Sequence, residues 1–125
     1  MINSEQLQMA FVRARNYLES NKEIVNSLNV FPVPDGDTGT NMSLTMKSAI
    51  KNLENSKINT CADVTKAISD GALMGARGNS GVILSQILRG FYLGSKESVT
   101  LDVETIKECF VNAYKVAYKS VIKPT

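Results

Sequence analysis

An all-α fold is predicted for this chain, and three observations lead to that prediction. Apolar residues recur at helical spacing along nearly the whole sequence, and no segment shows sustained strand alternation between turn signals. The 125 residues have the length of one domain, and 43% apolar with 21% charged residues is the composition of a globular protein. We therefore expect about six helices and no sheet in a single domain that covers residues 1–125.

Each expected helix is defined by an apolar stripe at helical spacing. In chain order, the stripes cover residues 7–18, 24–28, 42–53, 64–74, 82–91 and 103–116. Asn3 or Ser4 can cap the first helix, and Thr100 can cap the last. Thr60 followed by Asp63 has the spacing of a capping box at the start of the fourth helix.

The absence of histidine excludes several mechanisms within this chain. A Ser-His-Asp triad, a Cys-His pair, a His-ligated zinc ion and a histidine general base all need that residue. The net charge of +2 and the scattered basic residues give no indication of nucleic-acid binding. No apolar run approaches the roughly 20 residues that span a bilayer, and no secretory signal is visible, so we expect a cytoplasmic protein without a membrane span. Cys61 and Cys109 have no metal-ligand spacing and are expected to be packing residues.

The residues able to carry chemistry gather in two glycine-rich turns, of which the first covers residues 35–41. The preceding FPVP segment cannot be helical, because proline fixes φ and favours extended geometry in the residue before it. Asp35 and Asp37 stand on either side of one glycine, and two carboxylates this close repel each other unless a cation or a proton lies between them. Mg²⁺ suits such a pair, because it binds one or two protein carboxylates together with substrate phosphates.

Hydrogen-bond donors at a helix start follow directly after these carboxylates. Thr38, Thr40 and Asn41 provide hydroxyl, amide and backbone N–H groups where the helix dipole favours an anion. Metal and phosphate would therefore meet in this turn, although an ordinary acidic turn that caps a helix has the same residues. The spacing does not match a calcium-binding EF-hand loop, and the chain has no P-loop motif.

A second turn repeats this arrangement with fewer acidic residues. Its glycines, Gly75, Gly78 and Gly81, allow close backbone approach, and Asn79 or Ser80 can cap the following helix or donate to a phosphate. A tight interhelical turn, in which glycines let two helices pack closely, is the alternative interpretation. Both turns open directly into an apolar helix, and their occurrence together on a helical chain without histidine favours a shared function.

Residues 29–42 (NVFPVPDGDTGTNM) and 71–86 (GALMGARGNSGVILSQ) resemble the two motifs of the dihydroxyacetone kinase L-type (DAK2 or DhaL) nucleotide-binding domain. Both motifs are most similar to the amino-terminal ATP-binding domain of bacterial fatty acid kinase, and the resemblance covers essentially the whole chain. It implies an antiparallel helical barrel of about eight helices that holds ATP or ADP and two Mg²⁺ ions at one rim. Because the family domain is longer, we expect a truncated, incomplete barrel of about six helices with an exposed apolar flank, which could favour a homodimer.

The resemblance assigns site residues one position at a time. It implies that Asp35 and Asp37 are magnesium ligands with a catalytic role. It implies phosphate and nucleotide contacts by Thr38, Gly39, Thr40, Asn41, Asn79 and Ser80. The sugar-ketone branch has a third aspartate before the pair, but this chain has Val30 there, and the neighbouring Asn29 could supply a carbonyl oxygen to one metal ion. This difference fits the fatty acid branch better.

The function that the resemblance implies is Mg²⁺-dependent transfer of the γ-phosphoryl group of ATP to a fatty acid carboxylate. The fatty acid would arrive on a carrier protein that is bound by regions beyond this chain. One alternative is the nucleotide-carrying L subunit of dihydroxyacetone (glycerone) kinase. Another alternative is a non-catalytic helical interaction module whose turns only cap helices.

Overall fold

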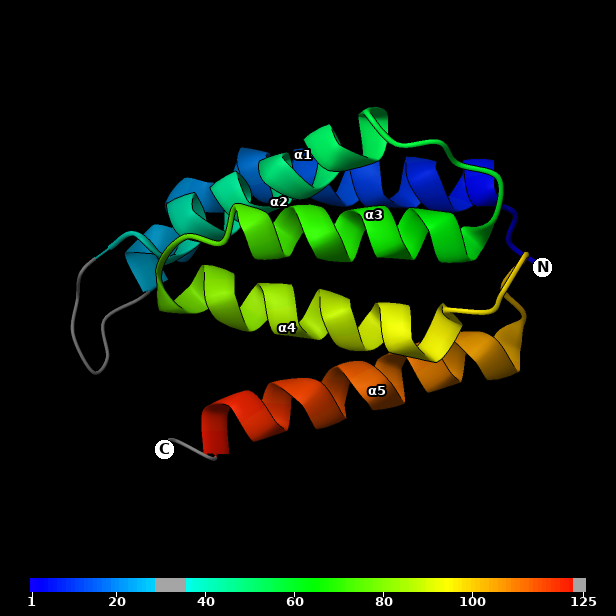
Figure 1. Ribbon diagram of the computed structural model, residues 1–125. Coiled ribbons are helices and arrows are strands. Elements are labelled where there is room, and N and C mark those ends of the chain that lie inside the picture. Colours follow the sequence, from blue (N-terminus) through cyan, green and yellow to red (C-terminus); the bar gives the residue numbers. More distant parts are fainter. Residues whose placement is uncertain (29–35, 123–125) are drawn as a thin grey trace.

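The structure, a computed structural model, describes residues 1–28 and 36–122, with side chains up to Ser120 (Figure 1). This part of the chain forms five helices and no strand. They are α1 (Ser4–Leu28), α2 (Thr38–Glu54), α3 (Cys61–Met74), α4 (Gly78–Ser95) and α5 (Val103–Ile122). Ile2 and Leu101 form an isolated antiparallel β-bridge. The predicted all-α fold is confirmed.

The expected number of about six helices was too high, because the first two apolar stripes belong to one helix. α1 runs without a break over 25 residues. The segment between the stripes, residues 19–23, is polar but contains no glycine or proline that would end a helix. The gap in the apolar pattern therefore reflects a change in what the helix contacts, not the end of the helix.

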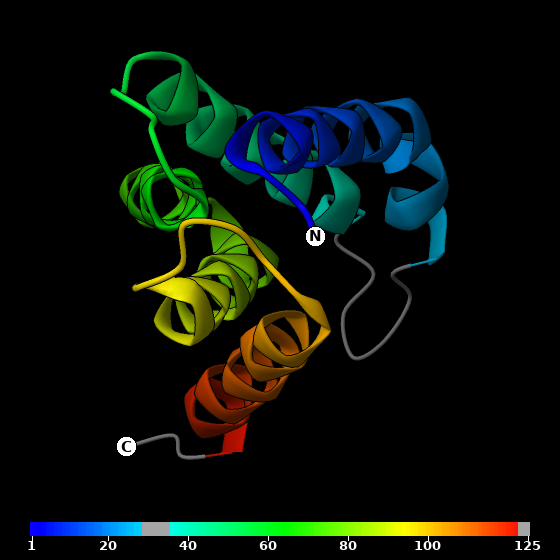
Figure 2. The same cartoon turned by 90° about the vertical axis from the view of Figure 1, so that its right-hand side faces the viewer.

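Consecutive helices pack against each other as neighbours, from α1 through α2, α3 and α4 to α5. α2 also contacts α4, whereas α5 packs against α4 alone among the described helices. Seen from the end, the helices follow an open curve with α1 and α5 at its two edges (Figure 2). The starts of α1, α3 and α5 lie at one end of the molecule, and the starts of α2 and α4 lie at the other (Figure 1).

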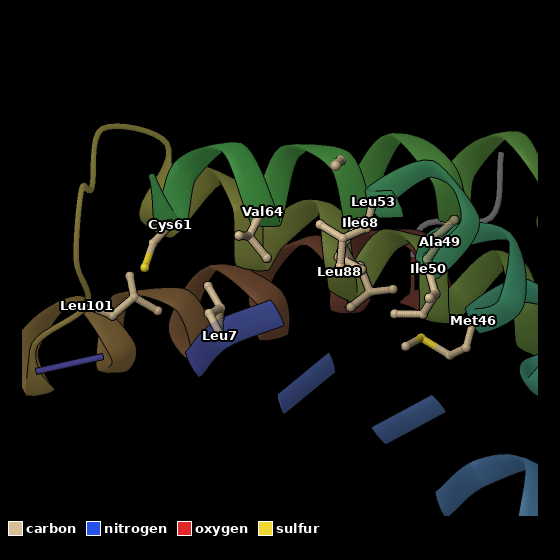
Figure 3. Packing of buried hydrophobic residues seen from close by; sticks show 12 residues of the cluster. Leu7, Met46, Ala49, Ile50, Leu53, Cys61, Val64, Ile68, Leu88 and Leu101 are labelled. Carbon is tan, nitrogen blue, oxygen red and sulfur yellow. The ribbon is translucent and has the colours of Figure 1, made fainter. Parts of the chain in front are cut away.

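The core lies mainly between α2 and α3 (Figure 3). Its members are 0–7% exposed and include Leu7, Met46, Ala49, Ile50, Leu53, Cys61, Val64, Ala67, Ile68, Ala72, Leu88 and Leu101. The stripes predicted for α2 and α3 supply most of these residues, because both helices are covered on two sides. Cys61 and Cys109 are buried free thiols, as expected of packing residues.

The stripe predicted for α4 was wrong at its start. Val82 is 49% exposed, and the buried positions of this helix are mostly small, including Gly81, Ser85 and Gly90. A Cβ atom at Gly90 would collide with the α5 backbone at Ala113, so α4 and α5 approach each other too closely for larger side chains. Small residues therefore mark the packed face of α4.

The outer face of α5 is apolar and exposed. Val103 is 82% exposed, Phe110 64% and Tyr114 66%. The predicted stripe of α5 is thus only partly buried, with Ala113 inside and Phe110 edge-on to Phe91 of α4 at 5.4 Å between ring centroids. This exposed face agrees with the expected apolar flank, whereas truncation and a homodimer stay predictions.

Candidate functional site

The two glycine-rich turns meet at the starts of α2 and α4. The Ser80 hydroxyl donates a hydrogen bond to the Thr38 carbonyl oxygen at 3.3 Å. The Arg77 backbone N–H donates to Thr45 Oγ1 at 3.1 Å. These bonds join positions about forty and about thirty residues apart in sequence, so the structure places the first turns of α2 and α4 side by side.

Glycines in the second turn allow this close approach. Gly78 has φ +67°, in the left-handed region that favours glycine, and a Cβ atom there would lie 2.5 Å from Asn41 Nδ2. A Cβ atom at Gly81 would collide with Thr45 Oγ1. Close helix packing, the alternative interpretation of this turn, is therefore part of the observed geometry, and it brings α4 onto the start of α2.

Capping distinguishes the two ends of the molecule. We call the starts of α1, α3 and α5 the capped end, because each N-cap residue there binds its own helix. The bonds to backbone N–H groups are Asn3 Oδ1 to Gln6 at 2.9 Å, Thr60 Oγ1 to Asp63 at 3.1 Å and Asp102 Oδ1 to Thr105 at 2.8 Å. The capping box of α3 is thus confirmed, while α5 is capped by Asp102 and not by Thr100, because the chain at Leu101 is still held in the bridge to Ile2.

We call the starts of α2 and α4 the turn end. Their N-cap residues, Asp37 and Arg77, make no side-chain capping bond within the described part of the chain. Helix geometry leaves the first backbone N–H groups of any helix without an intrahelical acceptor, and the helix dipole adds partial positive charge there. Two such helix starts side by side form a surface that suits an anion with several oxygen atoms, such as a phosphate chain.

α1 holds the start of α2 through a side chain that the sequence did not reveal. Asn26 Oδ1 accepts a hydrogen bond from the Thr40 backbone N–H at 3.0 Å, and Asn26 Nδ2 donates to Thr40 Oγ1 at 2.9 Å. Gly39 is buried beneath α1, and a Cβ atom there would collide with the Lys22 carbonyl oxygen. α1 therefore lies directly on the first turn of α2.

One helical turn further along the same contact, Glu19 accepts hydrogen bonds from three side chains of α1 and α2. The Ser43 hydroxyl is one donor, and the Lys22 and Lys47 ammonium groups lie 3.0 and 3.4 Å from Glu19 Oε1. The Ser43 hydroxyl and then Lys22 are the main causes that lower the pKa of Glu19 from an ordinary value of 4.5 to about 2. Polar residues at positions 19, 22 and 26 share one face of α1, and this spacing is the signal that could have revealed the contact.

The structure places most of the predicted site residues at the turn end. Asp37 and Asn79 are exposed, and Thr38, Thr40, Asn41 and Ser80 are half-buried, while Gly39 is covered by α1. Asp35 and Asn29 lie outside the described residues. Thr40 donates its backbone N–H to Asn26 and accepts from Asn26 at its hydroxyl oxygen, which leaves the hydroxyl hydrogen free to donate.

A magnesium ion fits the donor chemistry of this end. Asp37 is exposed and spends no oxygen on capping its helix, so its carboxylate can face a cation. No group of three or more acidic, cysteine or histidine residues suited to a metal occurs among residues 1–28 and 36–122. One carboxylate beside a surface of backbone N–H groups suits Mg²⁺, because this ion keeps several water ligands and shares substrate oxygens. Among the described helices, none has the length and apolarity to cross a membrane.

Comparison with known proteins adds a family match and relatives. The DAK2 domain family matches residues 32–125. An uncharacterized protein of Staphylococcus epidermidis is 45% identical over 123 residues, and uncharacterized proteins of Staphylococcus aureus strains USA300 and NCTC 8325 are 44% identical over the same length. The matches cover 98% of this chain and 22% of each relative, so the chain spans about a fifth of the length of these proteins.

Proposed function

Because this chain belongs to the DAK2 domain family of dihydroxyacetone kinase-like nucleotide-binding domains, we propose that it binds Mg²⁺–ATP at the turn end. The proposed reaction of the longer protein is transfer of the γ-phosphoryl group to a fatty acid carboxylate. A carrier protein that binds beyond this chain would present the fatty acid. The family is associated with kinase activity, and the choice of acceptor is our proposal.

The observation that supports this proposal best is the pairing of two helix starts whose own N-cap residues, Asp37 and Arg77, make no side-chain capping bond. Three helix starts at the capped end use their own side chains, whereas those of α2 and α4 do not and lie next to each other. A phosphate chain would satisfy backbone N–H groups of both helices at once. The fatty acid branch is favoured by Val30, since the sugar-ketone branch carries an aspartate at that position.

We assign the roles as follows. Asp35 and Asp37 would hold magnesium, which would supply positive charge beside the phosphate groups, and Asn29 could add a carbonyl ligand. Phosphate and nucleotide contacts would come from Thr38, Gly39, Thr40, Asn41, Asn79 and Ser80. A carboxylate acceptor is already ionised at neutral pH, so the transfer needs no general base, in keeping with a chain that has no histidine.

Titration calorimetry with ATP and Mg²⁺ tests the proposal. The wild-type chain should bind Mg²⁺–ATP, and Asp37→Asn should weaken binding by at least about 10–100-fold, because even residues that only support metal ligands are worth that much. Asp70→Asn is the matched control, since Asp70 is an exposed aspartate of α3 that pairs with Lys66 at 2.8 Å. Absence of binding by the wild type would favour the non-catalytic module. Phosphorylation of dihydroxyacetone but not of a carrier-bound fatty acid by the longer protein would favour the sugar kinase.

A further inference from the structure

We infer that Asn26 is a positioning residue for the cation site: it caps α2 in place of Asp37 and so leaves the Asp37 carboxylate available to the metal. The inference rests on the proposed function, because it assigns a part in the same Mg²⁺–nucleotide site. It concerns a residue on α1 that lies in neither of the two sequence motifs.

α5 shows what an aspartate in the position of Asp37 ordinarily does. Asp102 precedes α5 and Thr105 is the third residue of that helix, and the Asp102 carboxylate accepts the Thr105 backbone N–H at 2.8 Å. Asp37 and Thr40 have the same Asp-x-x-Thr spacing at the start of α2. An N-cap aspartate normally accepts the N–H of the second or third helical residue. Asp37 does not, although its sequence position is equivalent.

Asn26 accounts for this difference. The Thr40 N–H is already bonded to Asn26 Oδ1 at 3.0 Å, and the Thr40 hydroxyl accepts from Asn26 Nδ2 at 2.9 Å. Because the N–H must meet the amide oxygen, the NH₂ group must face the hydroxyl, and the two bonds support a single orientation of the amide. The Thr40 N–H that Asp37 would otherwise accept is therefore taken. The backbone of Asp37, at φ −122° and ψ 8°, also departs from the extended geometry of the Thr60 cap, at φ −130° and ψ 167°.

The contact between α1 and α2 allows Asn26, instead of Asp37, to cap α2. The absence of a side chain at Gly39 lets α1 come close enough for Asn26 to reach Thr40. The Glu19–Ser43 hydrogen bond holds the two helices together one turn further along. A carboxylate that caps a helix uses a lone pair on a backbone N–H, whereas the carboxylate of Asp37 is exposed and keeps its oxygens for a hard cation.

Three variants on α1 test the inference by calorimetry with Mg²⁺–ATP. Asn26→Leu removes the hydrogen-bond acceptor but keeps a side chain of similar size, so the Asp37 carboxylate should then bind the Thr40 N–H. The affinity for Mg²⁺–ATP should fall about tenfold or more, as for other residues that support metal ligands. Asn26→Asp keeps an acceptor for the Thr40 N–H and should bind within about twofold of wild type, a difference too small to reflect loss of such support. Asn16→Leu is the matched control, because Asn16 is an exposed asparagine of the same helix that contacts Arg15.

A melting-temperature cycle in metal-free buffer gives a readout that does not depend on nucleotide. Asn26→Leu should lower the melting temperature less in the wild-type background than in the Asp37→Ala background, because only the former retains a replacement cap. Additive shifts would overturn the inference. Normal Mg²⁺–ATP binding by Asn26→Leu would also overturn it, as would equal losses of affinity in Asn26→Leu and Asn26→Asp. In either case, weaker binding by Asp37→Asn would still support the proposed function. If the wild type bound no Mg²⁺–ATP, the proposed function would fall and the inference with it.

Discussion

The capped end and the turn end differ in how the free backbone N–H groups at their helix starts are bonded. At the capped end, Cys61 and Ala62 donate their N–H groups to the carbonyls of Val99 and Ser98 at 2.9 Å, in addition to the capping box of α3. Ile2 and Leu101 exchange two backbone hydrogen bonds of 2.9 Å beside them. At the turn end, neither Asp37 nor Arg77 caps its helix. Helices that begin at the capped end are thus capped by the residue that precedes them, whereas at the turn end α2 receives its cap from Asn26 of α1.

The two ends also differ in the stability that side-chain caps give to their helices. A side-chain cap stabilises a helix by about 1 kcal/mol, so the start of α4, whose N-cap residue Arg77 makes no capping bond, represents stability that the chain does not use. Such a sacrifice is expected where a ligand completes the hydrogen bonding. The turn end keeps its shape through contacts between helices, from Asn26 to Thr40 and from Ser80 to Thr38.

The largest effect is expected from closing the space beneath α1 at the turn end. Gly39→Ala should destabilise the chain by about 3 kcal/mol, the upper part of the range for overpacking, because the added Cβ meets a rigid backbone carbonyl at Lys22. Gly36→Ala is the matched control: nothing lies within 4 Å of its Cβ, and φ +70° alone should cost about 1 kcal/mol. Urea unfolding measures both. Equal losses would show that α1 does not rest on α2 as described.

A medium effect is expected when the turn end is given the cap that it does without. The Arg77 backbone, at φ −123° and ψ 125°, is extended as an N-cap requires. Arg77→Ser should therefore be more stable than Arg77→Ala by about 1 kcal/mol. Both variants lose the same charge, so the comparison isolates the cap. The serine hydroxyl would accept a hydrogen bond from an α4 backbone N–H that is proposed to bind phosphate. Arg77→Ser should therefore also bind Mg²⁺–ATP more weakly than Arg77→Ala.

Thermal unfolding of both variants, with and without nucleotide, measures the gain in stability and the loss of nucleotide binding. Equal stability of the two would mean that the start of α4 cannot accept a cap. Tighter nucleotide binding by the serine variant would contradict the proposed use of the α4 N–H groups.

The smallest effect concerns acid sensitivity of the α1–α2 contact. The pKa of Glu19 is lowered to about 2, and its side chain is 35% exposed, so solvent screens the interaction. A carboxylate whose folded pKa is lowered stabilises the fold above its unfolded value of 4.5, and this contribution disappears as pH falls towards 2. Glu19→Gln should thus melt below wild type at pH 7, with the difference vanishing near pH 2. Glu23→Gln is the matched control, since Glu23 is an exposed glutamate on the same helix, and it should melt close to wild type at pH 7.

The sequence predicted the fold well where local pattern and packing agree. α2 and α3 are covered on two sides, so their apolar stripes coincide with the core, and the Thr60–Asp63 box marks the start of α3. α4 was misjudged at Val82, since it packs through small residues whose burial depends on how closely α5 approaches. Such closeness is a property of two helices together and leaves no periodic signal in either one.

The candidate site was predictable only through its motifs. The glycine-rich pattern identified the two turns and the resemblance assigned their roles, but their closeness depends on bonds such as Ser80 to Thr38 that join distant positions. Asn26 was missed for the same reason, because its partner Thr40 is on another helix and its own surroundings in sequence are ordinary. The magnesium ligands and the fatty acid acceptor stay predictions, and Asp35 lies outside the described residues.

The pairing of Ile2 with Leu101 has a consequence for how the protein forms during translation. Residue 2 leaves the ribosome early, but its partner is made only after α4 is complete, so the nascent chain must hold its first residues unpaired until then. The Val99 and Ser98 carbonyls that meet the start of α3 arrive at the same late stage. These backbone bonds at the capped end therefore form only after residue 101 has been synthesised.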